Sequence, residues 1–215
     1  MLRALIVLLA CSSLWSGSWA QGFKFSNEET ADKAREAEKQ AQVQSQLAGP
    51  CRSKIKNQKI MVLIGESRDG RVQSTQSQFS NHFDAINGRL RSLGLKTFTQ
   101  AQITAQIAQA EVDAYFKNNP DAALSASKRL AAQYILRGMI SSQAAYNTMV
   151  RVNQVAIRMH FTLTDAGGKL LSETSVENSS YSGVDTSGMA LTLIGEKADE
   201  VVAQLYSDYC RMAGS

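Results

Sequence analysis

Histidine and cysteine are scarce in this chain, and their scarcity argues against a metal centre. Only two histidines occur among the 215 residues, His82 and His160, and they are far apart in the sequence. A zinc site takes three or four ligands, most often from histidine and cysteine. We therefore expect neither a metal site nor a metal cofactor.

The sequence also lacks the patterns that mark common catalytic and nucleotide-binding sites. It contains no Gly-x-Ser-x-Gly nucleophile elbow. The segment from Gly65 to Val72 connects an apolar run with a helical pattern, as a phosphate-binding loop does. Arg71 and Val72, however, occupy the places of the required Lys and Ser or Thr. We therefore predict no cofactor and no catalytic residues, and we interpret the chain as a protein that is not an enzyme.

We interpret the polar segment Gly65–Gly70, together with Arg71, as a connecting loop. Gly, Ser and Asp are typical turn residues. Glu66, Arg68, Asp69 and Arg71 would then lie on one exposed edge, which makes them candidates for contact with a partner protein.

No dense cluster of basic residues is present. The formal net charge is +4, and the lysines and arginines are scattered along the chain. Proteins that bind a phosphate backbone concentrate positive charge on one face. We therefore expect no nucleic-acid partner.

The longest apolar run lies at the N-terminus and is too short to span a bilayer. Arg3 precedes the run Ala4–Ala10, and Ser18-Trp19-Ala20 offers small residues for cleavage. About twenty apolar residues would be needed for a transmembrane helix. We predict a signal peptide over residues 1–20, a mature chain without a transmembrane segment, and a location in the periplasm.

A second reading of this segment concerns its cysteine. Leu8-Leu9-Ala10-Cys11 fits the pattern after which bacterial lipoproteins are cut and acylated. In that alternative, lipidation of Cys11 anchors the protein to the outer membrane.

Two cysteines remain in the exported chain, Cys51 and Cys210. An even number of cysteines in an oxidising compartment predicts a disulfide. Cys51 precedes the first expected strand, and Cys210 lies near the end of the last expected helix. The bond would therefore join the two ends of one domain.

Residues 21–53 differ in composition from the rest and are expected to form a polar helical tether. Glu28–Leu47 is rich in Ala, Gln, Glu and Lys and has almost no apolar stripe, so such a helix has little to bury. Gly49-Pro50 ends it. Residues 54–215 have the length and apolar content of a single α/β domain.

Apolar periodicity predicts the elements of this domain. Strands are expected at 59–64, 95–99, 134–140, 155–163 and 169–176, and helices at 79–93, 102–117, 119–132 and 191–209. A Ser/Gly-rich loop is expected from Asn178 to Ser187. The predicted fold class is α/β (α+β): a mixed sheet of about five strands with a C-terminal antiparallel meander, packed by helices.

Three segments of the sequence resemble a superfamily of exported bacterial envelope domains. They are the strand Ile60–Ile64 with the helix Phe79–Leu93, the strand entry Ala131–Ile140, and the hairpin Phe161–Leu171. The superfamily includes the N-terminal domain of Tol translocation protein B, the curli secretion lipoprotein, the lipoprotein activators of penicillin-binding proteins and the middle domain of flagellar assembly protein T. Gln133 departs from the Asp that is common in the family. The resemblance implies a non-catalytic module that binds partners in the periplasm or at the outer membrane.

The leading hypothesis is therefore a periplasmic protein-interaction module that supports an envelope assembly or a membrane machine. Its partners would be one or more envelope proteins, and a homo-oligomer is left open. The first alternative is a small periplasmic hydrolase whose site forms only in the fold, with a serine and an acid within reach of His160. The second is an outer-membrane-anchored lipoprotein assembly factor that uses Cys11.

Overall fold

The structure is a computed structural model that describes residues 26–68, 71–76, 80–117 and 119–213. The predicted signal peptide and Cys11 lie outside these residues. The chain divides into a first unit that ends at Glu38 and a second unit that begins at Lys39. Helix α1 (Ser26–Leu47) runs through this boundary, and in the first unit its side chains from Thr30 onward are exposed. The elements that follow α1 all belong to the second unit.

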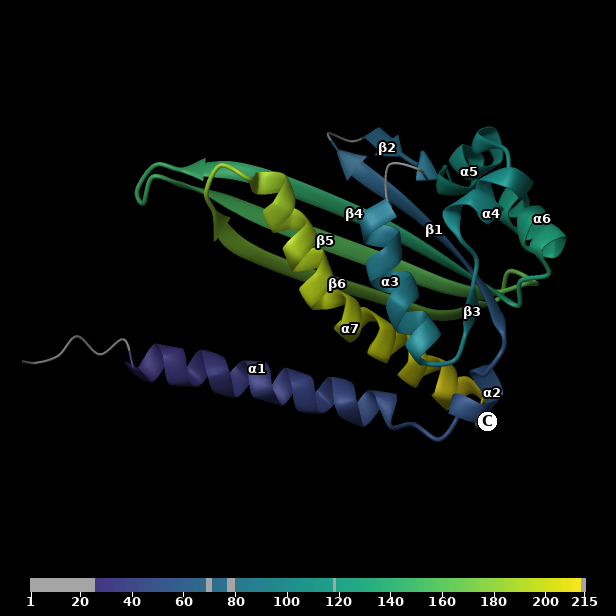
Figure 1. The fold of residues 1–215 in the computed structure, drawn as a ribbon, viewed down its shortest axis with the longest axis horizontal. Helices are drawn as coiled ribbons and strands as arrows, with labels where there is room; N and C mark the ends of the chain where they lie inside the picture. Colours follow the sequence, from purple (N-terminus) through teal and green to yellow (C-terminus); the bar gives the residue numbers. More distant parts are fainter. Residues whose placement is uncertain (1–25, 69–70, 77–79, 118, 214–215) are drawn as a thin grey trace, which may run out of the picture. The chain divides into compact units, whose positions relative to one another are not determined.

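A mixed sheet of six strands forms the centre of the second unit, counted over the described residues. Its strand order is β2-β1-β4-β5-β6, and β3 also pairs with β1 (Figure 1). The strands are β1 (Lys59–Arg68), β2 (Arg71–Gln73), β3 (Lys96–Thr97), β4 (Tyr134–Asn147), β5 (Val152–Asp165) and β6 (Leu170–Ser182). β1 is parallel to β3 and β4, whereas β4, β5 and β6 form an antiparallel meander. The predicted fold class is confirmed, with one strand more than expected.

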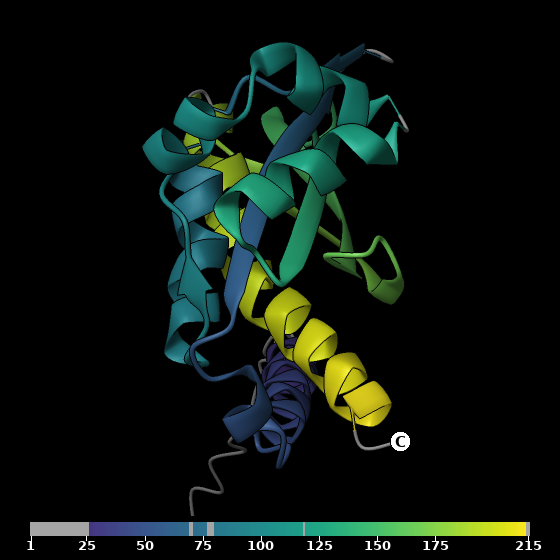
Figure 2. The same cartoon turned by 90° about the vertical axis from the view of Figure 1, so that its right-hand side faces the viewer.

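Helices pack on both faces of this sheet. They are α2 (Arg52–Ile55), α3 (Ser80–Ser92), α4 (Gln100–Gln106), α5 (Gln109–Phe116), α6 (Pro120–Leu130) and α7 (Thr186–Ala213). α3 and α7 cover one face, where Leu90 and Val202 meet Leu136 of β4. α5 lies on the opposite face, where Phe116 packs against Gly65. Figure 2 shows α4, α5 and α6 grouped together, away from the C-terminal end of α7.

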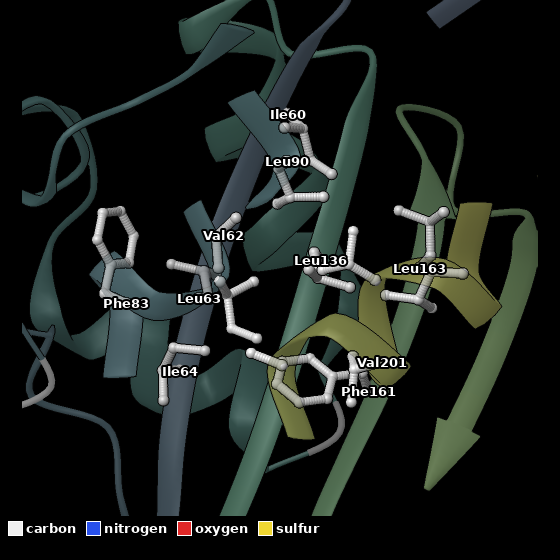
Figure 3. Close-up of a cluster of buried hydrophobic side chains, with 14 of the residues drawn as sticks. Ile60, Val62, Leu63, Ile64, Phe83, Leu90, Leu136, Phe161, Leu163 and Val201 are labelled. Atoms are coloured by element: carbon white, nitrogen blue, oxygen red, sulfur yellow. The ribbon is translucent and has the colours of Figure 1, made fainter. Parts of the chain in front are cut away.

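The core is built around β1, whose apolar run is covered on both faces as predicted. Every residue from Ile60 to Ile64 is at most 2% exposed. Figure 3 shows this run beside Phe83 and Leu90 of α3 and Phe161 of β5. Because successive strand side chains point to opposite faces, burial of all five requires helices on both sides.

All three strands of the meander are longer than the sequence predicts, and β5 extends over Val152–Asp165 instead of 155–163. β4 continues past Ile140 to Asn147, and β6 continues past Val176 to Ser182. The expected Ser/Gly-rich loop from Asn178 is therefore wrong as far as Ser182. These extensions pair with β5 through their backbones, and many of their side chains are exposed and need not be apolar.

The single helix expected over 102–117 is also wrong, because the chain breaks into α4 and α5. Ile107 and Ala108 adopt extended backbone conformations between the two helices. The break buries Ile107 in the core, and the Ala108 N–H donates to the Glu111 carboxylate at 2.9 Å. That side-chain acceptor satisfies one of the free N–H groups at the start of α5.

The two ends of the second unit are joined covalently. Cys51 and Cys210 form a disulfide with their Cα atoms 5.5 Å apart. Close to it, the Tyr206 hydroxyl donates a hydrogen bond of 2.6 Å to the Gly49 carbonyl. The segment before α2 is therefore held against the last turns of α7.

Candidate functional site

The segment expected to be an exposed polar loop is instead the end of a β-hairpin. Glu66 and Arg68 belong to β1 and Arg71 to β2, with Arg68 paired to Arg71. Asp69 lies outside the described residues. The loop interpretation is wrong because backbone pairing between β1 and β2 continues the strand through this polar sequence.

The residues of this hairpin that are predicted to contact a partner differ in their exposure to solvent. Arg71 is exposed, whereas Glu66 is half-buried on the face covered by α3. Ser142 of β4 donates a hydrogen bond of 3.4 Å to the Glu66 carboxylate. Burial lowers the pKa of His82 on α3, and the Glu66 carboxylate opposes that shift. Glu66 therefore takes part in contacts within the fold.

The outer edge of β6 is the longest unpaired strand edge among the described residues. β6 has thirteen residues and pairs with β5 on one side, and no strand among the described residues pairs with its other side. Backbone N–H and C=O groups along such an edge can pair with another chain. The apolar pattern predicts this strand only as far as Val176, so half of the edge is missing from the prediction.

A polar groove of about 320 Å³ runs beside the first half of β6. Its walls are the last turns of α1, the middle of β6 and the middle of α7. The lining residues are Lys39, Gln42, Val43, Gln46, Glu173, Thr174, Ser175, Val176, Glu200 and Gln204. A hydrogen bond of 2.7 Å from Gln46 to Gln204 ties the end of α1 to α7. The groove thus gives a partner strand on β6 a polar wall to contact.

His160 lies on β5, one strand inside this edge and on the sheet face opposite α7, and both of its ring nitrogens have partners. Its Nδ1 is 2.9 Å from the Ser175 hydroxyl, and its Nε2 is 3.2 Å from the Glu173 carboxylate. On the same face Arg158 forms an ion pair with Glu177 at 2.6 Å. Strand register places these groups side by side, since His160 is opposite Ser175 and Arg158 opposite Glu177.

A serine, a histidine and an acid therefore meet in the fold, as the hydrolase alternative requires. The site around them is open, because the side chains of His160 and Glu173 are 41% and 55% exposed. Efficient acyl transfer also needs fixed hydrogen-bond donors for the oxyanion in a site that excludes water. Cross-strand pairing on a solvated sheet face accounts for the observed contacts.

An open depression of about 460 Å³ lies between the second half of β4 and the start of α7, and none of its lining residues is charged; they are Ser142, Gln143, Ala144, Ala145, Val155, Thr186, Ser187 and Ala190. An apolar cavity of about 30 Å³ beneath α7 is bordered by Tyr134 and Tyr209, whose hydroxyls are 2.9 Å apart. Burial, and then the hydrogen bond with Tyr209, raise the pKa of Tyr134. A space of that size holds about one water and no substrate. Among the described residues no three or more His, Cys, Asp or Glu are placed to hold a metal ion.

No helix in the described part of the chain combines the length and the apolar character needed to span a bilayer.

Comparison with known proteins gives a likeness of fold at low identity. No protein-family model and no curated protein matches the chain. Lipoprotein GNA1162 from Neisseria meningitidis is 15% identical, with 67% of this chain and 98% of that chain covered and a TM-score of 0.41. A minor lipoprotein from Acinetobacter baumannii is 10% identical, with 71% and 92% covered and a TM-score of 0.43. The LpoB C-terminal domain from Salmonella enterica is 15% identical, with 60% and 93% covered and a TM-score of 0.38.

These identities and TM-scores are too low to transfer a function to the chain. The expected relation to Tol translocation protein B and the curli secretion lipoprotein stays a prediction.

Proposed function

We propose that this chain is a non-catalytic protein-interaction module of the bacterial cell envelope, and that it binds an envelope protein along the outer edge of β6. The observation that carries the proposal is the length of this edge, a strand of thirteen residues that pairs with β5 on one side. Addition of a partner strand to such an edge is a common mode of protein recognition.

The sequence of β6 supports a binding role for the edge. Natural sheets protect their edge strands with Lys, Pro or bulges. Residues 170–182 contain no Lys, Arg or Pro, and the register irregularity with β5 falls at Leu171, so residues 172–182 pair regularly. Glu173 and Glu177 are the charged side chains of the strand, and they favour a partner that carries basic residues. The Cys51–Cys210 disulfide fits an exported protein in an oxidising compartment.

In this proposal the N-terminal residues serve for export or membrane attachment and as a spacer. Residues 1–20 would direct export, or Cys11 would carry a lipid anchor at the outer membrane. Residues 21–53 would act as a polar tether that separates the α/β domain, residues 54–215, from its point of attachment. The intact mass of the protein recovered from cells distinguishes cleavage after Ala20 from acylation of Cys11.

Photo-crosslinking from the β6 edge tests the interaction. A crosslinking amino acid at Ser179 should capture an envelope protein, whereas the same group at Arg91 on α3 should not. Ser175→Lys with Ser179→Lys, introduced for affinity capture, should reduce recovery of that protein about tenfold by placing charges along the edge.

Gln154→Lys with Ala156→Lys is the matched control, because it adds the same charges to exposed positions of β5 on the same face. Equal recovery with both double variants, or equal crosslinking from Arg91, would show that β6 is not the binding edge.

A second candidate function is hydrolysis at Ser175, favoured by its contact with His160. Turnover of a p-nitrophenyl ester that disappears in Ser175→Ala and in His160→Ala would support it. Ser175→Ala leaves the backbone edge intact, so the interaction proposal predicts that this variant still captures the partner.

A further inference from the structure

Large apolar side chains are exposed together at one end of the meander. They are Tyr146, Met149, Val150, Tyr181 and Val184, and Met149 and Val184 are 92% and 100% exposed. The β4–β5 turn and the β6–α7 connection leave the sheet at the same end, on the left in Figure 1. The register confirms this, because Asn153 of β5 is opposite both Tyr146 and Ser182. We call this set the apolar tip.

The two connections of the apolar tip are tied to each other and held by polar groups. The Asn153 side-chain amide donates a hydrogen bond of 2.7 Å to the Gly183 carbonyl. The Asn147 side-chain oxygen accepts from the backbone N–H groups of Met149 and Val150, at 3.0 and 3.3 Å. Asn147 thus forms the turn, and the side chains of Met149 and Val150 are not needed for it.

Val184 has no packing role in the helix that follows it. The Asp185 carboxylate accepts from the Gly188 N–H at 2.7 Å, so Asp185 is the N-cap of α7. The residue before an N-cap often packs against the fourth helical residue, which here is Met189. Val184 is fully exposed and makes no such contact. The backbone of this connection therefore keeps the apolar side chain of Val184 exposed to solvent.

The two tyrosines of the apolar tip lie on opposite faces of the sheet. Tyr146 shares a face with Asn153 and Ser182, because these residues are opposite one another in the register. Tyr181 is next to Ser182, so it lies on the other face. Tyrosine rings are enriched where a protein crosses from water into lipid.

The charge of the hairpin suits an anionic surface. No Asp or Glu occurs from Tyr134 to Thr164. Of the three arginines in this stretch, Arg151 lies in the turn. Arg158 pairs with Glu177, and Arg137 contacts the Phe116 carbonyl away from the tip. Arg151 is exposed within the turn, with a φ of 56°. The nearest acid in the second connection is Asp185, which is engaged in capping α7.

We propose that the apolar tip inserts into the surface of an anionic lipid bilayer. Its aliphatic side chains project from two convex turns, which fits penetration between headgroups better than a flat or concave protein interface. The tyrosines on both faces would lie at headgroup level, and Arg151 would face anionic lipid. This inference is independent of the β6 partner, and its test needs no partner protein.

Tryptophan quenching by brominated lipids locates the contact. Met149→Trp places a reporter at the apolar tip, and Leu170→Trp places one at an exposed position at the opposite end of the meander. With vesicles of brominated phosphatidylcholine and phosphatidylglycerol, we expect quenching of the reporter at position 149 and not of the one at 170. The variants are produced without residues 1–20, so Trp15 and Trp19 are absent and each variant has a single tryptophan.

A variant that adds negative charge to the apolar tip provides the second measurement. Met149→Asp with Val184→Asp should lower sedimentation with the same vesicles about tenfold, because it removes apolar area and adds negative charge. Leu170→Asp should leave it unchanged, and added salt should weaken the binding of the parent chain. Thermal unfolding midpoints equal to that of the parent chain would show that the variants are folded.

Three results would overturn the inference. They are no quenching at position 149, equal quenching at 149 and 170, and self-association that Met149→Asp with Val184→Asp abolishes without any binding to vesicles. The last result would assign the apolar tip to a contact between copies of the chain.

Discussion

At the scale of single residues, the side chain of Gln76 replaces a missing stretch of strand. β3 pairs with β1 at residues 59–60 and β2 pairs with it at 66–68, which leaves the edge of β1 unpaired between them. The Gln76 amide accepts from the Ile64 N–H at 3.0 Å and donates to the Ile64 carbonyl at 2.8 Å. Gln76 is only 1% exposed. A side-chain amide thus satisfies the backbone groups that a strand would otherwise pair.

Replacing Gln76 should therefore destabilise the domain strongly. Gln76→Leu leaves a buried N–H and a buried carbonyl of Ile64 without partners, which should lower the free energy of unfolding by about 3 kcal/mol. Urea denaturation measures the change. Gln106→Leu, at an exposed position of α4, is the matched control and should stay within about 0.5 kcal/mol of the parent. A loss no larger than that of the control would refute the role of the amide.

At the scale of elements, side chains from β1 and β5 pack directly over Gly138 of β4. A Cβ added there would lie 2.8 Å from Ile64 Cδ1 and still closer to the Phe161 ring. Gly138 therefore leaves room for the Phe161 ring, which is fully buried. The sequence pattern places this glycine in a strand but gives no reason specific to its neighbours.

Gly138→Ala should cost about 1–3 kcal/mol of stability, because the core around it must shift to admit a methyl group. Gly88→Ala is a control for which we expect the opposite change in stability. A Cβ at Gly88 meets nothing within 4 Å, so alanine should stabilise the exposed side of α3 by up to about 1 kcal/mol. Thermal unfolding of the two variants side by side checks both signs. A stable Gly138→Ala protein would mean that Phe161 can move at little cost.

Element types could be predicted from the sequence where residues are buried, and element ends could not. The run Ile60–Ile64 and the alternation of β5 from Val155 to Leu163 indicate strands because their side chains enter the core. Residues 141–147 of β4 carry Ser, Gln, Ala and Asn and are held by pairing with β5, which leaves no apolar pattern. The break at Ile107 depends on the packing of that side chain against other elements, which local periodicity does not encode.

The residues of the candidate site could also be predicted only in part from the sequence. The two cysteines could be paired from their number alone, because the predicted cleavage after Ala20 leaves only Cys51 and Cys210. The contact between His160 and Ser175 depends on the register of β5 with β6, and no motif indicates it. The hairpin at Glu66 resembles a loop in sequence because its turn-forming residues also pair as strand.

At the scale of the whole molecule, the disulfide closes almost the entire second unit into one covalent loop. Cys51 and Cys210 are 159 residues apart in sequence. Replacing both with serine should lower the free energy of unfolding by up to about 5 kcal/mol, because the unfolded chain regains the freedom that the crosslink removed. Urea denaturation of the parent chain with and without a reducing agent should reproduce this difference. The doubly substituted variant should not respond to the reductant.

The same crosslink determines how the domain would carry mechanical tension. A pull on the chain before residue 49 reaches Cys51 and passes directly through the sulfur atoms to the C-terminal turns of α7. α7 packs along β5 and β6, so the load would be shared by a broad helix–sheet contact instead of peeling β1 away from its neighbours. A domain held at its N-terminal segment and loaded at β6 would therefore resist extension through sliding of packed surfaces, and reduction of one bond would make it mechanically weak.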